Sequence, residues 1–177
     1  MREVVLYIAM SLDGYLADDR GGVDWLRGED PAGENLDTYT AFSQGVDTVL
    51  LGWNTYHQVV TELAPEGWVY ADKTCYVLTH RDLPSRDGVS FTGEDPCALV
   101  RRLRRQPGKN IWVCGGADLI RQLMAGDCID RYVITVMPVC LGGGKPLFQP
   151  TGRELPLRLL DTRHGNGMVE LTYERRR

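Results

Sequence analysis

Short apolar runs separated by glycine-containing turns recur along the chain, and most have the length of a buried strand. The first is Val4-Val-Leu-Tyr-Ile8, inside a strand expected over 2–10. Near-continuous apolar runs of this kind are typical of parallel strands covered on both faces. By the same pattern, further strands are expected over 46–51, 73–79, 89–92 and 111–114.

Most of these runs lead into a segment whose apolar residues repeat at helical spacing. Helices are expected over 34–44, 53–60, 96–105 and 117–126. Asp95-Pro96 is a strong start signal, because Asp is a favoured N-cap and Pro a favoured first helical residue. The segment 15–33 is rich in Gly, Asp and Glu and predicts a long irregular loop, a length at which loops are often functional lids.

The end of the chain has a different pattern. A long strand is expected over 129–139, followed by two strands over 155–162 and 168–174 that Gly165-Asn-Gly167 joins as a hairpin. The sequence therefore predicts a single α/β domain over residues 1–177. Its central sheet is mostly parallel, with helices on both faces and antiparallel C-terminal strands.

Composition narrows the function classes. The chain has 177 residues, 43% of them hydrophobic, and a net charge of −4, which gives no electrostatic reason to expect a nucleic acid partner. No apolar run reaches membrane-spanning length, and the first residues do not form a signal peptide. Five cysteines without a C-x-x-C pair indicate a reduced, cytoplasmic protein, and the three histidines have no metal-ligand spacing.

The candidate chemistry lies where strands end. Gly115-Gly116 stands between an apolar run and a helix, so free backbone N–H groups at the helix start form an anion site that a phosphate can approach closely. Gly52-x-x-Thr55 and Thr79-His80-Arg81 follow two other strands. Ligands of open parallel sheets bind at this carboxyl edge, so the three junctions together favour a phosphate-bearing ligand.

No strong nucleophile or acid–base signature accompanies these junctions, which favours a cofactor that carries the chemistry itself. The loop Leu141-Gly-Gly-Gly-Lys-Pro-Leu-Phe148 lacks the spacing of a P-loop. We interpret it as a flexible turn in preference to a phosphate cradle.

Four motifs in order resemble a known family. Ser11-Leu-Asp-Gly14, Val49-Leu-Leu-Gly52-x-x-Thr55-Tyr56, Val113-Cys-Gly-Gly116 and the glycine loop 141–148 resemble the reductase domain of riboflavin biosynthesis. Dihydrofolate reductase shares the second and third. The resemblance covers nearly the whole chain, from Val4 to Tyr173. It implies a dihydrofolate reductase-like fold, NADPH as hydride donor and a homodimer, for which the strand 129–139 is a candidate interface.

By the same resemblance, two sets of residues form the site. The cofactor would be bound by Ala9, Gly52, Thr55, Thr79, His80, Arg81, Gly115, Gly116, Ala117, Asp118 and Leu119. The substrate would be bound by Ser11, Asp13, Trp25 and Asp37, with Trp25 or Trp68 covering its ring. Asp37 or Asp13 would supply the proton, unless ordered water does.

The sequence departs from the family at Trp53, at the pterin-binding acid, for which Glu34 and Asp37 do not have a clean spacing to Gly52, and in the missing deaminase signature. Trp53 stands where dihydrofolate reductases commonly have Arg, so either Arg81 supplies the charge for the 2′-phosphate of NADPH or NADH is used. Asp118 would repel a phosphate unless its side chain turns away. The deaminase signature of the bifunctional riboflavin enzyme is missing, since Pro96-Cys97 is followed by Ala-Leu, so a stand-alone reductase domain is expected.

We therefore predict an NADPH-dependent reductase of a small pterin- or pyrimidine-like heterocycle. The alternative is a non-catalytic nucleotide- or small-molecule-binding protein on the same fold. A purely structural or partner-binding domain is a third interpretation, and it predicts no nucleotide binding.

Overall fold

The computed structural model describes residues 1–176. Its elements are, in chain order, β1 (Val4–Ser11), β2 (Tyr15–Ala17), α1 (Tyr39–Gln44), β3 (Val46–Gly52), α2 (Trp53–Gln58), a π-helical turn η1 (Val59–Leu63), β4 (Thr74–Leu78), β5 (Val89–Thr92), α3 (Pro96–Arg104), β6 (Asn110–Gly115), α4 (Ala117–Ala125), β7 (Arg131–Met137), β8 (Lys145–Pro146), β9 (Leu157–Gly165) and β10 (Met168–Arg175).

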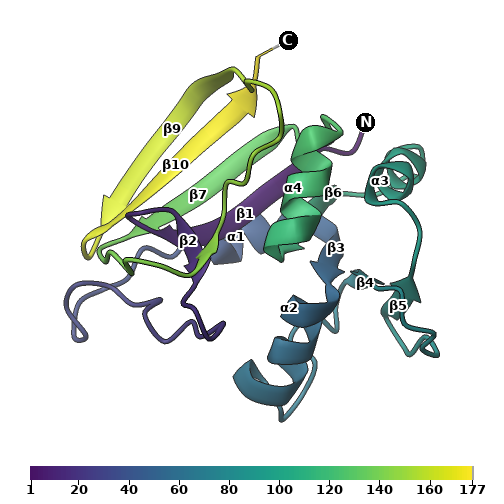
Figure 1. Ribbon diagram of the computed structural model, residues 1–177, viewed down its shortest axis with the longest axis horizontal. Helices are drawn as coiled ribbons and strands as arrows, with labels where there is room; N and C mark the ends of the chain where they lie inside the picture. The colour runs from purple at the N-terminus through teal and green to yellow at the C-terminus, as the bar shows by residue number, and fades with distance from the viewer. Residues whose placement is uncertain (177) are drawn as a thin grey trace.

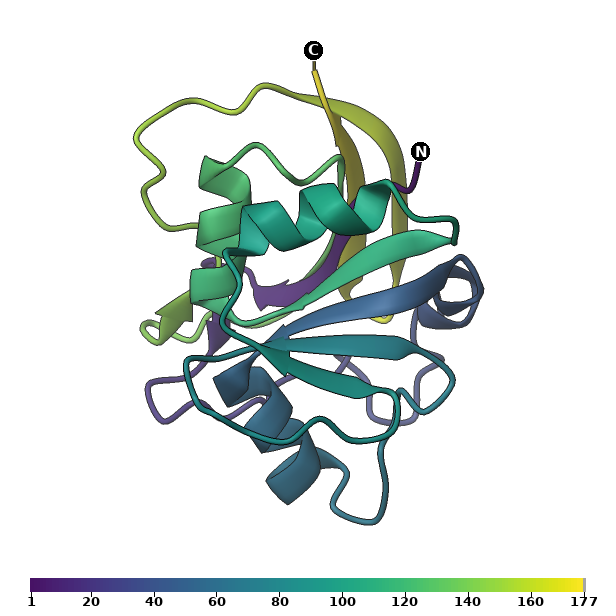
Figure 2. The same cartoon turned by 90° about the vertical axis from the view of Figure 1, so that its right-hand side faces the viewer.

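One eight-stranded sheet organises the molecule, in the order β5-β4-β3-β6-β1-β7-β10-β9. All neighbours from β5 to β7 are parallel, whereas β10 is antiparallel to both β7 and β9. Figure 1 shows β9 and β10 beside β7 at one side of the molecule, and Figure 2 shows the parallel strands fanned from β1 to β5. The predicted mostly parallel sheet with antiparallel C-terminal strands is confirmed.

Helices cover both faces of the sheet, as predicted. On one face, α3 and α4 bury apolar side chains such as Leu99, Ile120 and Leu123 against β1, β3, β6 and β7. On the other, Phe42 of α1 and Tyr56 of α2 pack against aromatic and aliphatic residues of β3 to β6. Full burial of one such side chain stabilises the folded state by about 1.5–3 kcal/mol. The helices on both faces therefore hold the strands of the sheet in place.

The predicted helix 34–44 begins later than its sequence pattern indicates, at Tyr39. The preceding segment lies beside the β9–β10 turn, where the Asn166 side chain accepts the Asp30 N–H at 2.8 Å and donates to Asn35 at 2.7 Å. The Asp37 carboxylate accepts the Thr40 N–H at 3.2 Å, which stabilises the start of the helix. Long-range bonds therefore replace the first helical turns.

Two short strands interrupt regions predicted as loops. β2 lies in the segment 15–33 and pairs with β8 of the glycine loop, with Tyr15 opposite Pro146 and Ala17 opposite Lys145. The predicted C-terminal hairpin is confirmed, since Asn166 and Gly167 are the two turn residues and have φ of 49° and 75°.

The strand predicted over 129–139 is β7, which lies inside the sheet. It is hydrogen-bonded to β1 on one side and to β10 on the other. Its backbone is therefore not available to pair with a second subunit. β9 and β5 are the open edges of the sheet.

Candidate functional site

Three strand ends meet at the carboxyl edge of the parallel sheet. In the strand register, Leu51 of β3 lies beside Gly115 of β6, and Gly52 lies beside Leu78 of β4. Leu78 is the last residue of β4 and directly precedes Thr79. The three junctions that the sequence singles out are therefore neighbours in space.

The Gly52-x-x-Thr55 and Gly115-Gly116 junctions are in close contact. A Cβ added to Gly116 would lie 3.1 Å from the Thr55 hydroxyl oxygen, and one added to Gly52 would lie 3.3 Å from the Gly116 nitrogen. Both distances are tighter than ordinary van der Waals contact. A side chain at either position would therefore push its neighbour by a few tenths of an ångström, and the Thr55 hydroxyl lies against the Gly115-Gly116 turn.

The start of α4 offers free donors at this point. The Ile120 N–H is bonded to the Gly116 carbonyl at 3.1 Å, and no side chain caps the helix. The N–H groups of Ala117, Asp118 and Leu119 precede this bond and have no partner within the helix. Leu119 buries its side chain in the core, so only its backbone could face a ligand.

Asp118 does not oppose an anion at this helix start. Its carboxylate accepts from Arg121 at 2.7 Å and from Gln122 at 2.6 Å, both further along α4. These two bonds, Arg121 first, lower the pKa of Asp118. The side chain is turned along the helix, and its charge is partly balanced by Arg121.

The Thr79-His80-Arg81 junction contacts the Gly52-x-x-Thr55 junction through the Trp53 ring. The Arg81 guanidinium lies 4.8 Å from the centre of the Trp53 ring, within cation–π distance. The Arg81 N–H donates to the Thr79 hydroxyl at 3.1 Å, and His80 beside them is exposed. A cationic side chain is therefore held beside α2, where Trp53 replaces the usual arginine.

A group of polar side chains lies on β7 and β10, in line with Ala9 of β1. Ala9 of β1, Thr135 of β7 and Glu170 of β10 are direct neighbours in register and form one row across three strands. Glu170 is only 4% exposed, although it is a carboxylic acid. The Thr38 hydroxyl donates to its carboxylate and is also within 2.8 Å of the Tyr7 hydroxyl.

Tyr7 anchors this polar group in an aromatic cluster. Its ring stacks on Phe42 with centroids 4.1 Å apart, and Trp112 meets it edge-on at 6.3 Å. Burial raises the pKa of Tyr7 and outweighs the opposite effect of its hydrogen bond to Thr38. Tyr7 therefore stays a neutral donor at physiological pH.

A comparison with family models identifies this arrangement. The model of the RibD C-terminal domain matches residues 2–169. The chain belongs to the RibD C-terminal domain family. Its dihydrofolate reductase-like fold agrees with that assignment.

Among relatives of this RibD C-terminal domain protein, the uncharacterized protein YwjB of Bacillus subtilis (strain 168) is 44% identical over 177 residues, which cover 98% of each chain. A crystal structure of a Shewanella sp. PV-4 protein assigned to riboflavin biosynthesis is 31% identical, with a TM-score of 0.84 and 99% of each chain covered.

The bifunctional diaminohydroxyphosphoribosylaminopyrimidine deaminase/5-amino-6-(5-phosphoribosylamino)uracil reductase of Thermotoga maritima has the same fold at 14% identity and a TM-score of 0.71. The match covers 98% of this chain and 56% of that one.

The expected substrate carboxylates of the RibD C-terminal domain protein occupy different environments. Asp37 is exposed and bonded to Thr40. Asp13 accepts from the Ser11 hydroxyl at 2.6 Å and from the Leu141 and Gly142 N–H groups at 3.0 and 2.8 Å. These bonds, Ser11 first, lower the pKa of Asp13. Asp13 therefore connects the turn after β1 to the glycine loop as an ionised carboxylate.

The two tryptophans expected to cover the substrate lie apart from each other. Trp25 is half-buried and donates to the Gly22 carbonyl at 3.2 Å, so its ring is fixed within its own loop. Trp68 packs between Tyr56 and Tyr70, with ring centroids 5.5 and 5.2 Å away. Trp68 is thus part of the aromatic core that supports α2.

Sequence reasoning missed the polar group of Glu170, Thr38, Tyr7 and Thr135. The alternation of β10, in which Glu170 separates Val169 from Leu171, gives no sign that the acid faces inward. The only available signal was its position in the row that contains Ala9, which needs the strand register.

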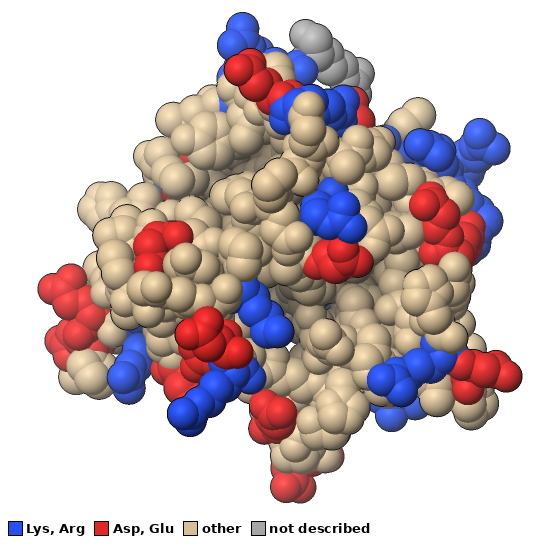
Figure 3. Space-filling view, in the orientation of Figure 1, with Lys and Arg blue, Asp and Glu red and all other residues tan. Residues whose placement is uncertain are grey.

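Two absences hold for the described part of the RibD C-terminal domain protein. Within residues 1–176 no three His, Cys, Asp or Glu side chains are grouped closely enough to hold a metal ion. Across the same residues no helix has the length and apolar character needed to cross a bilayer. On the face drawn in Figure 3, acidic and basic side chains are interspersed.

Proposed function

We propose that the protein is an NADPH-dependent reductase of a small pyrimidine- or pterin-like heterocycle. The observation that supports this best is the contact between the Thr55 hydroxyl and the Gly115-Gly116 turn at the free N-terminus of α4. The glycines allow the Thr55 hydroxyl to approach the free N–H groups at the start of α4, and donors grouped in this way suit a phosphate. Membership of the RibD C-terminal domain family supports the same conclusion.

The residues of this edge fit a dinucleotide. The N–H groups of 116–119 would bind the pyrophosphate, and Gly52 and Thr55 the phosphate on the adenosine side. Bound NADPH supplies the hydride, and the chain supplies position and exclusion of water. Ala9 would lie against the nicotinamide, with Ser11 and Asp13 shaping the adjoining turn.

Arg81 decides between NADPH and NADH in this proposal. Thr79 and His80 would lie beside the adenosine ribose, and the Arg81 guanidinium is already held over Trp53. A guanidinium that stacks on an aromatic face keeps in-plane N–H groups free to bind a phosphate. We therefore expect Arg81 to replace the missing arginine and to favour the 2′-phosphate of NADPH.

The substrate would lie over the row of Ala9, Thr135 and Glu170. Glu170 is the buried acid of this face, and Thr38 joins it to Tyr7. A glutamate side chain in this position can take part in proton transfer or accept an N–H group of a heterocycle. Of the acids considered, Glu170 fits this role better than the exposed Asp37 or the ionised Asp13, and Trp25 would close the site from its loop.

The proposal is tested by titrating the purified protein with NADPH and with NADH while following tryptophan fluorescence. Oxidation of NADPH is then followed at 340 nm across a panel of pyrimidinones, pterins and quinones. Quenching by NADPH together with turnover of one heterocycle class is the expected result. Absence of any nucleotide binding contradicts the proposal.

A non-catalytic nucleotide-binding protein is the second candidate. It is favoured by the engagement of Asp13 in bonds within the chain and by the exposure of Asp37, which leave Glu170 as the only buried acid of the site among residues 1–176. This candidate predicts binding of NADPH without oxidation by any member of the panel. Homodimer formation, which the family resemblance implies, is a separate proposal, and β9 offers the open edge for it.

A further inference from the structure

Two free cysteines, Cys97 and Cys128, meet where α3 begins and α4 ends. Cys97 is the second residue of α3, and Cys128 lies in the connection from α4 to β7. Cys128 is only 4% exposed and belongs to the apolar core beneath the two helices. Cys97 is half-buried and packs against the same core from outside. The fold therefore pairs a buried cysteine with a partly exposed one.

Both sulfur atoms contact the turn that ends α4. The Cys97 thiol donates to the Gln122 carbonyl at 3.6 Å, and the Cys128 thiol donates to the Gly126 carbonyl at 3.4 Å. The Gly126 N–H closes the turn by donating to the Gln122 carbonyl at 2.9 Å. A Cβ added to Gly126 would overlap the Cys97 sulfur. The lack of a side chain at this position therefore makes room for Cys97 beside Cys128.

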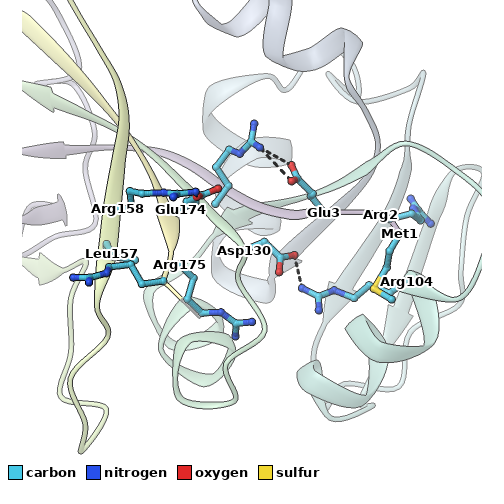
Figure 4. Close-up of a pocket in the computed structure, with 11 residues that line it drawn as sticks. Met1, Arg2, Glu3, Arg104, Asp130, Leu157, Arg158, Glu174 and Arg175 are labelled. Atoms are coloured by element: carbon cyan, nitrogen blue, oxygen red, sulfur yellow. Dashed lines mark hydrogen bonds and ion pairs between the residues drawn. The ribbon is translucent and has the colours of Figure 1, made fainter.

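The backbone of Cys128 is held by the other end of α3. Arg104 donates to the Cys128 carbonyl at 2.8 Å and forms an ion pair with Asp130 at 2.5 Å. Figure 4 shows this ion pair at the edge of a cavity between the first residues of β1 and β7. Contacts at both ends of α3 therefore fix Cys128 relative to Cys97.

The two thiols differ in their access to a reagent. Burial, followed by the interaction with Cys97, raises the pKa of Cys128 to about 12, so this side chain stays a protonated thiol at neutral pH. Oxidation of cysteine depends on thiolate character and on exposure of the sulfur. Cys97 is the more exposed of the two, and an oxidant from solvent therefore meets it first.

We propose that Cys97 and Cys128 form a site of reversible oxidation, at which a peroxide links the start of α3 to the end of α4 through a disulfide. The pair has the features of a redox site, with one accessible cysteine and a second cysteine held beside it. The inference does not depend on the proposed reductase activity.

The reaction has two steps. The Cys97 sulfur attacks one oxygen of hydrogen peroxide, the O–O bond breaks, and the other oxygen leaves with the thiol proton as water, so that Cys97 becomes a sulfenic acid. The Cys128 sulfur then bonds to the Cys97 sulfur, the S–O bond breaks, and the hydroxyl leaves with the Cys128 proton as water. Two thiols are oxidised and one peroxide is reduced to two waters.

The other three cysteines lie away from this pair. Cys75 and Cys114 belong to the cluster on the opposite face of the sheet. Cys140 is exposed and directly precedes the glycine loop. Cys140 is therefore the matched control, because it is open to oxidants but has no part in the proposed bond.

The test is treatment of the purified, reduced protein with hydrogen peroxide, followed by alkylation of the remaining thiols and mass spectrometry of non-reduced peptides. Peptides joined through Cys97 and Cys128 are expected, with the loss of two alkylated thiols, and dithiothreitol should restore both. The linked protein should have an unfolding midpoint higher by about 5 °C or more, because the bond closes a loop that contains β6 and α4.

Three variants establish which cysteine acts in which step. Cys128→Ala should leave a sulfenic acid at Cys97, which the probe dimedone traps, whereas Cys97→Ser should give no dimedone adduct at Cys128. Cys140→Ser should form the link as the unmodified protein does. Thermal unfolding of the reduced proteins checks that each variant is folded. The proposal is overturned if the folded, unmodified protein gives no link between Cys97 and Cys128, or if Cys140→Ser abolishes it.

Discussion

Thr38 donates its hydroxyl hydrogen to Glu170, and this bond joins residues that are 132 positions apart. It holds the segment before α1 against β10, the strand beside the edge strand β9. The same hydroxyl is in contact with Tyr7 of β1, so three distant parts of the chain share one polar group. Glu170 of this group lies in the same row across the sheet as Ala9 and Thr135.

Replacing Glu170 by Gln is expected to lower turnover by at least about a hundredfold, because the amide keeps the shape of the side chain but cannot transfer a proton. NADPH binding should be unchanged, since Glu170 lies away from the glycine junctions. The measurement is steady-state NADPH oxidation with the heterocycle that the panel identifies.

Asp37→Asn is the matched control for this substitution. Asp37 is exposed and accepts from Thr40. If Asp37→Asn abolishes turnover and Glu170→Gln does not, the proton-transfer role belongs to Asp37, which is one of the candidates from the sequence alongside Asp13 and ordered water.

Gly52→Ala tests the contact between the two glycine junctions. The backbone of Gly52 has φ of −75°, which alanine adopts freely, so the effect comes from the methyl group alone. That group would be 3.3 Å from the Gly116 nitrogen, and we expect a cost of about 1–3 kcal/mol in stability with weaker NADPH binding.

Gly67→Ala provides the comparison for this variant, because no atom lies within 4 Å of the added methyl group. Urea unfolding and nucleotide titration of both variants are the measurements. Equal behaviour of the two would show that the junctions are not in close contact.

Arg81→Gln is expected to raise the dissociation constant of NADPH about tenfold and to leave that of NADH unchanged. The reason is that only NADPH has a 2′-phosphate, which in the proposed function binds the Arg81 guanidinium over Trp53. Fluorescence titration with each nucleotide measures the two constants. A parallel loss for both nucleotides would instead assign Arg81 to general support of α2.

Asp13→Asn is expected to destabilise the fold at pH 7, and the effect should depend on pH. The pKa of Asp13 is lowered in the folded state, chiefly by the Ser11 hydroxyl. Such a carboxylate contributes stability above its unfolded pKa of about 3.9, and this contribution is lost as pH falls through the lower folded pKa.

The measurement for Asp13 is thermal unfolding of both proteins between neutral and acid pH. The difference in midpoint between the unmodified protein and Asp13→Asn should shrink below about pH 4. A difference that does not vary with pH would mean that the substitution acts through something other than charge.

Light scattering should detect a homodimer if the open edge of β9 is the interface. Leu159 and Leu160 are 51% and 43% exposed on this strand, an unusual cost for an edge that stays in water. Leu160→Lys should give monomers, whereas Leu63→Lys, at a 55% exposed leucine of η1, should not. Dimers in both variants would exclude β9.

The parts of the fold that sequence could predict are those with local causes. Asp95 accepts the Ala98 N–H at 2.8 Å at the start of α3, as its position before Pro96 predicts. The turn at Asn166-Gly167 follows from residues that tolerate positive φ. Helix α1 could not be placed in this way, because its first expected turns are replaced by bonds to Asn166.

The candidate site likewise contains some residues that the sequence could identify and others that only the folded structure reveals. Gly52 and Gly116 could be found in the sequence because each stands where a strand ends and a helix begins, and Thr55 because it lies in the first turn of the helix after Gly52. The stacking of Arg81 on Trp53 and the burial of Glu170 depend on which strands are neighbours. No local pattern carries that information.

The ribbon of β2 and β8, together with Asp13, makes the glycine loop and the turn after β1 a single unit outside the eight-stranded sheet. Under the proposed function, exchanging this unit would reshape one wall of the substrate site and leave the glycine junctions intact. Protein engineers could therefore graft loops of new length here to alter substrate choice, and natural variation has the same freedom.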